Sequence, residues 1–282
     1  MRRIAVLCLI LSLVLPAVLL AGPHPWERKL PFKQATIHYS ISGSETGSQT
    51  LYIKDQGRYT SQHKKSATRM FGMNQPEQET LEIKTPEWVY SVDLKARTAS
   101  QSVNPEVYMI EEFGRLSAAE QKKALANAEK FGRSTLNSLG GEVQRKAATL
   151  LGYPCDVVRV MGTENYSIAD SDVTLKTVVS MMGMNTRIEA TRIDTGSVPE
   201  DKFRVPAGIP VTRTTEGDAL MRDNARMVVQ MLVSGQQPTV QLMAPAAAAQ
   251  AMENDADDAG DDDMPSAEEM QAILKMFGGQ QK

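Results

Sequence analysis

Apolar and polar residues alternate with a period of two along much of this chain, and no other feature constrains its fold as strongly. In residues 35–41, Ile37, Tyr39 and Ile41 alternate with polar residues, which is typical of a strand with one buried face. The same alternation returns in residues 88–94, and glycine, proline and polar turn residues separate the segments. Short alternating strands at this spacing predict an antiparallel meander.

Similar segments predict further strands on both sides of a central helical region. We expect them near Leu51 and Ile53, near Leu81 and Ile83, and over residues 58–65, 96–103, 143–150, 155–161, 173–182, 187–193 and 202–205. The polar residues 66–77 are expected to form a loop.

Helical signals interrupt these strands. Ser117 and Glu120 form a capping box, and we expect the helix that follows them to end near Gly132. Its apolar stripe is Ala124, Leu125, Ala128 and Phe131. Residues 108–113 predict a shorter helix just before it. A further helix is expected over residues 216–233, with Gly235 at its end. Its apolar stripe is Leu220, Met227, Val228 and Met231.

Residues 1–21 have the layout of a secretory signal. Two arginines precede an almost purely apolar run over residues 4–15, and Pro16 closes it. We expect cleavage after Ala21 and a periplasmic or secreted protein. Leu19 stands where a small residue is preferred, so an uncleaved helix that anchors the protein in the inner membrane is the alternative. Cleavage would leave Cys155 as a single cysteine, which we expect to be buried.

The chain changes character after residue 235. Residues 236–264 combine alanine and proline with an acidic run that is too charged to fold alone, and we expect a disordered linker. Residues 265–278 predict a short amphipathic helix with an apolar stripe of Met270, Ile273, Leu274 and Phe277. This helix either folds back onto the body, residues 22–235, or docks into a groove of an envelope protein.

Several segments of the body carry a family likeness. They include Gly57-Arg58-Tyr59, residues 79–83 and 87–94, Leu151-Gly152-Tyr153-Pro154-Cys155, Thr191-Arg192-Ile193-Asp194 and residues 199–208. Over residues 33–210 the chain resembles the LolA-like lipoprotein-carrier superfamily, and its second half is similar to exported bacterial proteins of a domain-of-unknown-function family. The resemblance implies an α+β fold in which a curved antiparallel half-barrel closes over helices and holds acyl chains. No residue matches a functional position of a carrier.

Catalytic and metal-binding signals are weak. The sequence has no Gly-x-Ser-x-Gly, His-Glu-x-x-His or phosphate-loop motif, and no basic patch that would suit nucleic acid. Thioether ligands suit Cu(I), but strand alternation separates Met181 from Met182, which favours core or cavity lining. The acidic run matches a calcium loop only in part, because Ser266 stands where a bidentate glutamate belongs. We therefore expect no enzyme, no cofactor and no bound metal.

Together these features predict a membrane-proximal, non-enzymatic protein that binds lipid or lipoprotein acyl chains between sheet and helices. The residues we expect to line this site are Tyr39, Trp88, Tyr90, Val179, Met181, Met227 and Met231. The alternative is an envelope interaction module with a fully packed sheet, which recruits a protein partner through its C-terminal helix.

Overall fold

The computed structural model describes residues 24–26, 30–70, 73–181, 183–215 and 217–236. These residues all belong to the first of two units, Met1–Gln237 and Pro238–Lys282. The predicted signal, the linker and the C-terminal helix with Met270, Ile273, Leu274 and Phe277 lie outside the described residues.

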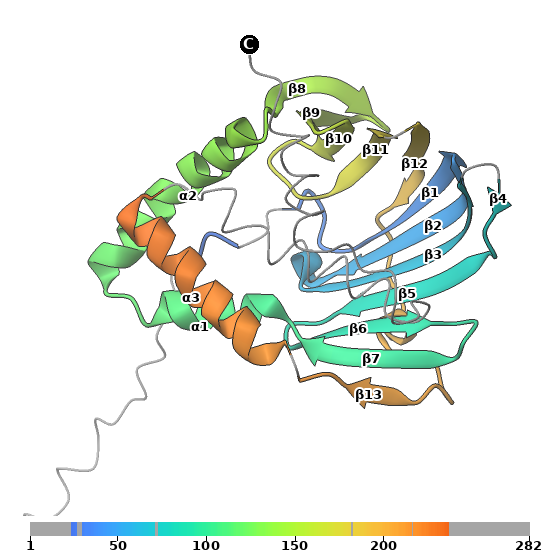
Figure 1. Cartoon of the computed structure of the whole chain (residues 1–282), viewed down its shortest axis with the longest axis horizontal. Coiled ribbons are helices and arrows are strands. Elements are labelled where there is room, and N and C mark those ends of the chain that lie inside the picture. Colours follow the sequence, from blue (N-terminus) through green and yellow to red (C-terminus); the bar gives the residue numbers. More distant parts are fainter. Residues whose placement is uncertain (1–23, 27–29, 71–72, 182, 216, 237–282) are drawn as a thin grey trace, which may run out of the picture. The chain divides into compact units, whose positions relative to one another are not determined.

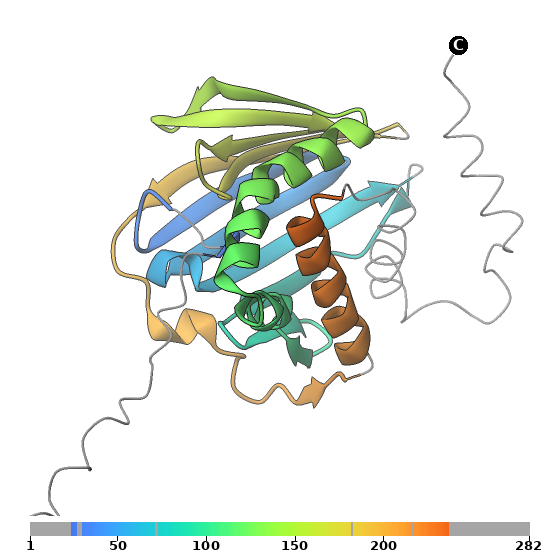
Figure 2. The same ribbon diagram turned by 90° about the vertical axis from the view of Figure 1, so that its left-hand side faces the viewer.

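The described part is built on a curved sheet of thirteen strands with α-helices over one face (Figures 1 and 2). The strands are β1 (Ala35–Gly43), β2 (Glu45–Lys54), β3 (Tyr59–Met70), β4 (Met73–Asn74), β5 (Gln78–Lys84), β6 (Trp88–Asp93), β7 (Thr98–Val103), β8 (Glu142–Leu150), β9 (Tyr153–Val160), β10 (Thr163–Ile168), β11 (Thr174–Met181), β12 (Met184–Asp194) and β13 (Val211–Arg213). The predicted fold class, α+β with a curved antiparallel sheet, is confirmed.

Two meanders meet in the middle of this sheet. The strand order is β13-β7-β6-β5-β3-β2-β1-β12-β11-β10-β9-β8, and β4 pairs with β3. β1 and β12 pair antiparallel, so the N-terminal meander joins the meander that follows the helices. Only the pairing between β13 and β7 is parallel among the described strands.

Two sequence-based expectations about the strands are wrong, and two strands were not expected. The expected loop over residues 66–77 is largely strand, because β3 runs to Met70 and β4 follows. The expected strand over residues 202–205 is replaced by a 3₁₀ turn, η2 (Glu200–Phe203), which lies between Pro199 and Pro206. Proline lacks a backbone donor, so the two flanking prolines disfavour the extension of a ladder beyond either end of this segment. The strands β10 and β13 were also not among those expected.

Three α-helices are found among the described residues: α1 (Pro105–Gly114), α2 (Ala118–Ser138) and α3 (Asp218–Ser234). The capping box is confirmed, because the Ser117 hydroxyl accepts from the Glu120 backbone and the Glu120 carboxylate accepts from the Ser117 backbone. Gly235 ends α3 with a φ of 71°, a conformation that favours glycine. The expected end of α2 near Gly132 is wrong, since the helix continues for almost two turns.

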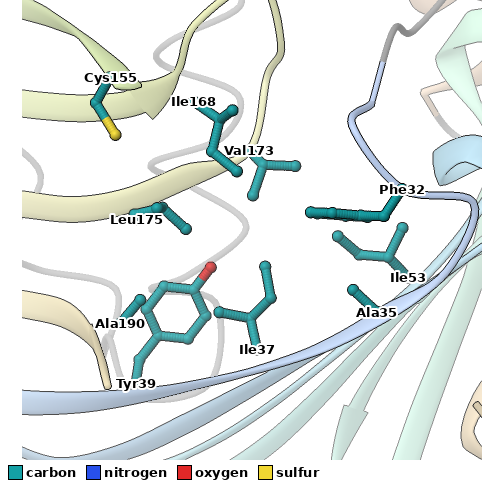
Figure 3. Packing of buried hydrophobic residues seen from close by; sticks show 10 residues of the cluster. All are labelled: Phe32, Ala35, Ile37, Tyr39, Ile53, Cys155, Ile168, Val173, Leu175 and Ala190. Atoms are coloured by element: carbon teal, nitrogen blue, oxygen red, sulfur yellow. The ribbon is translucent and has the colours of Figure 1, made fainter. Parts of the chain in front are cut away.

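The apolar core is divided among three clusters. The first lies on the face of the sheet that carries Ala35, Ile37 and Tyr39, which we call the inner face; side chains from β1 and β2 there point toward those from β9–β11 (Figure 3). The second joins the helices through Phe113, Ala124, Val229 and Leu232. The third lies on the opposite, outer face, where Val198 and Phe203 cover Ile83.

Candidate functional site

The inner face contains a cavity of about 400 Å³ beside the first core cluster. Its lining is Leu30, Tyr39, Gln49, Leu51, Ile53, Thr60, Gln62, Asp172, Val173, Thr174, Lys176, Thr177 and Ile188. These residues come from β1–β3, β11 and β12, together with the lead-in before β1 and the turn before β11. The site therefore depends on the junction between the two meanders.

The pairing of β1 with β2 shows which residues form the apolar floor of the cavity. Ala35 pairs with Ile53, Ile37 with Leu51, and Tyr39 with Gln49. Directly paired residues share a face, so Leu51 and Ile53 lie beside the buried side chains of β1.

Tyr39 is held in a fixed position at this floor. It is 6% exposed, and its hydroxyl donates a hydrogen bond to the Thr174 carbonyl oxygen at 3.0 Å. Burial raises the pKa of Tyr39 well above its ordinary value, so the phenol stays neutral and acts as a donor.

The inner face becomes polar beyond β2. Leu51 pairs with Gln62 and Ile53 with Thr60, and both partners line the cavity. On the next strand, Glu82 pairs with Gln62 and Lys84 with Thr60, so the polar character continues across β5. An ion pair of 2.6 Å from Lys84 Nζ to Glu106 Oε1 links this face to α1. The cavity thus has an apolar floor with a polar side toward β3, and Asp172, Thr174, Lys176 and Thr177 add polar residues on its β11 side.

Only Tyr39 of the seven predicted ligand-binding residues lines this cavity. Trp88 and Tyr90 lie on the outer face. Tyr90 pairs with Ile83 of the third cluster, and Trp88 is two residues before Tyr90 on the same strand, so both side chains point to the same face. The Arg213 guanidinium lies 4.9 Å from the centre of the Trp88 ring. These two aromatic residues therefore pack the outer face of the sheet.

The other four predicted residues also lie apart from the cavity lining. Val179 is half-buried and follows Thr177 by two positions on β11, whereas Met181 is 40% exposed at the end of that strand. Met227 and Met231 are half-buried on α3 and lie outside the apolar cluster that joins the helices. The structure therefore does not bring the seven residues together around one ligand.

Most of the lining residues were not among those predicted from the sequence. Leu51, Ile53 and Ile188 belong to strands that were predicted, so the alternation of these strands could have indicated that the three residues share a buried face. Gln49 and Gln62 had no such signal, because a polar residue in a strand is usually solvent-exposed. Only the register between strands shows that they share a face with Tyr39.

A second hollow, of about 640 Å³, is dominated by charges that neutralise one another. Arg159 lies in its lining and binds two carboxylates, with Nε 2.8 Å from Glu164 Oε1 and Nη1 2.9 Å from Glu142 Oε1. The hydrogen bond from Arg159 is the main reason why the pKa of Glu164 is lowered. These cross-strand pairs account for the polarity of this hollow without a ligand.

No group of three or more histidine, cysteine, aspartate or glutamate residues that could hold a metal ion is found in the described part of the chain. The prediction that Cys155 is buried is confirmed, and burial raises the pKa of its thiol. Such a thiol is a poor nucleophile. No described helix is both long and apolar enough to cross a bilayer.

No protein-family model matches the sequence, and no curated protein matches it. Among solved structures, an uncharacterized conserved protein from Thermus thermophilus is similar at a TM-score of 0.39 and 11% identity, over 64% of this chain and 91% of that one. PNGF-II gives 0.34 and 13%, over 70% of this chain and 33% of its own length. MucB gives 0.32 and 14%, over 64% and 59%. Likenesses this weak transfer no activity, ligand or partner.

Proposed function

We propose that this chain is a non-enzymatic binding protein of the cell envelope that holds an apolar ligand, such as an acyl chain of a lipid or lipoprotein, in the inner-face cavity. The observation that supports this most strongly is the cavity itself, about 400 Å³ in volume, with Tyr39, Leu51, Ile53 and Ile188 in its lining. Ligand pockets are typically about 300–1,000 Å³ and mostly apolar, with a few placed polar groups. A half-barrel of the lipoprotein-carrier kind would use the same face.

The energetics of burial favour a chain-like apolar ligand in such a site. Each buried methylene contributes about 0.8 kcal/mol, so ten methylenes supply on the order of 8 kcal/mol before the cost of association. Since a Kd of about 1 μM corresponds to about 8 kcal/mol, a chain of moderate length would reach micromolar affinity only if association costs little.

A fluorescent fatty acid, 11-(dansylamino)undecanoate, tests this function on the full chain. We expect saturable binding of one probe per chain. Ile188→Trp fills the cavity and should weaken binding at least about tenfold. Val143→Trp is the matched control, because Val143 is 43% exposed on β8 and should leave the affinity unchanged. An absence of probe binding, or equal affinities for the two variants, would contradict the proposal.

The envelope location is proposed from residues 1–21 alone. N-terminal sequencing of the protein from fractionated cells tests it. Gly22 as the first residue of a periplasmic or secreted protein supports cleavage, and Met1 in the inner-membrane fraction supports the anchor. Recovery of the intact chain from the cytoplasm would contradict both.

A further inference from the structure

The polar side of the cavity carries two amides without a protein partner. Gln49 and Gln62 are half-buried and line the cavity, and their side chains make no hydrogen bond within the described part of the chain. A ligand that enters the cavity would exclude water from these amides, and a polar group removed from water costs free energy unless it finds a partner. A bound ligand with hydrogen-bonding groups would supply that partner.

Register places these two amides next to each other at the edge of the apolar floor. Gln49 pairs with Tyr39 on one side, and Gln62 pairs with Leu51. Gln49 and Gln62 are therefore diagonal neighbours on β2 and β3, a spacing of about 7–8 Å that long side chains can bridge. One small polar group could contact both amides at once.

The lysines around this region are already paired. Lys64, which pairs with Gln49 across β2 and β3, has its Nζ 2.7 Å from Glu45 Oε1. Lys84 binds Glu106 at 2.6 Å, and Lys176 of the lining lies 3.8 Å from Glu189 Oε1. A carboxylate or phosphate at the amides would thus find no free ammonium group among these lysines to offset its desolvation.

We infer that the ligand is a single-chain amphiphile with an uncharged, hydrogen-bonding head. Its chain lies against Leu51, Ile53 and Ile188, and its head binds the amides of Gln49 and Gln62. The cavity volume of about 400 Å³ is near the lower end of the range for ligand pockets, which suits one chain better than several. This inference rests on the proposed function and adds the class of ligand to it.

Four ligands with the same twelve-carbon chain length separate the effect of the head from that of the chain. They are 1-monolauroylglycerol, methyl laurate, laurate and dodecyltrimethylammonium, each used below its micelle concentration to displace the dansyl probe from the full chain. Monolauroylglycerol should displace the probe at about tenfold lower concentration than any of the other three, because it alone offers neutral hydroxyl groups to both amides.

Gln49→Leu/Gln62→Leu should remove this preference and keep the affinity for methyl laurate, which also shows that the variant is folded. Gln78→Leu makes the same change at an exposed position on β5 and should keep the preference. Equal affinities for all heads, tightest binding of laurate, or an unchanged preference in the double variant would overturn the inference while leaving chain binding in place. If the probe and all four ligands fail to bind, the proposed function itself is wrong.

Discussion

The hydroxyl of Tyr39 donates a hydrogen bond to the carbonyl oxygen of Thr174 at 3.0 Å and thereby joins β1 to the start of β11 beside the cavity. Tyr39→Phe would leave this carbonyl without its partner and should lower the free energy of unfolding by about 1–2 kcal/mol. Urea unfolding measures the loss. Tyr52→Phe on the outer face is the control, and equal losses for both variants would contradict the role of this bond.

Tyr39 should also make stability depend on alkaline pH. Burial raises the pKa of the folded-state phenol above its unfolded value of about 10. Its contribution is therefore fully present below about pH 10, falls by about 1.4 kcal/mol per pH unit above it, and is lost once the pH passes the folded pKa. Unfolding free energies from about pH 9 to 11 should show a shallower decline for Tyr39→Phe than for the wild type. Parallel declines would contradict the assignment to Tyr39.

Asp156 on β9 stabilises the irregular segment of the edge strand β8. The buried carboxylate accepts the Lys146 backbone N–H at 2.8 Å and the Arg145 guanidinium at 2.6 Å, where the register of β8 with β9 shifts. Asp156→Ala should destabilise the protein by about 2–3 kcal/mol, because it takes a charged acceptor away from two donors, the Arg145 guanidinium and the Lys146 backbone N–H. Chemical denaturation measures this. Asp223→Ala, at an exposed position, is the control. If Asp156→Ala lowers the free energy of unfolding no more than Asp223→Ala does, the role of Asp156 is contradicted.

Lys146 itself adopts a φ of 51°, which glycine adopts without steric cost. Lys146→Gly should therefore leave stability unchanged or raise it by up to about 1 kcal/mol. Lys146→Val should lower it, because β-branched residues fit this region poorly. The difference in thermal midpoint between the two variants is the measurement, and a more stable valine variant would show that the backbone here is not strained.

The capping box at the start of α2 gives a separate test of helix formation. Ser117→Ala removes the acceptor for the Glu120 backbone N–H and should cost about 1 kcal/mol in urea unfolding. Ser117→Asp should restore most of this, since aspartate is also a favoured N-cap residue. A loss that aspartate does not restore would mean that Ser117 contributes something other than the cap.

The architecture could be predicted from the sequence because its main strands alternate clearly. Ile37 and Tyr39 indicate a buried face of their strand, whatever position that strand takes in the sheet. Ser117 and Glu120 indicate the start of a helix. β10 was not predicted because residues 163–168 are mostly polar. β13 was not predicted because three residues are too few to show an alternation. The 3₁₀ turn η2 was not predicted because residues 202–205 resemble a short strand unless the flanking Pro199 and Pro206 are considered.

The candidate site was less predictable than the fold, for a reason visible at Trp88 and Tyr90. Alternation shows that these residues share a face with each other, but it does not show which face of the sheet carries the cavity. In this protein Val198 and Phe203 cover the outer face, so apolar strand residues are needed there too. Gln49 and Gln62 could be assigned to the inner face only through their pairing with Tyr39 and Leu51.

Photolabelling can show whether the inner-face cavity is the ligand site. A twelve-carbon fatty acid with a diazirine on its chain would be bound to the full chain, irradiated and mapped by tandem mass spectrometry. We expect labels in residues 35–53 and 173–190, which carry Tyr39, Leu51, Ile53 and Ile188, and we expect these labels to be lost in Ile188→Trp. Labels confined to exposed apolar residues such as Met161, Val211 and Leu220 would contradict it.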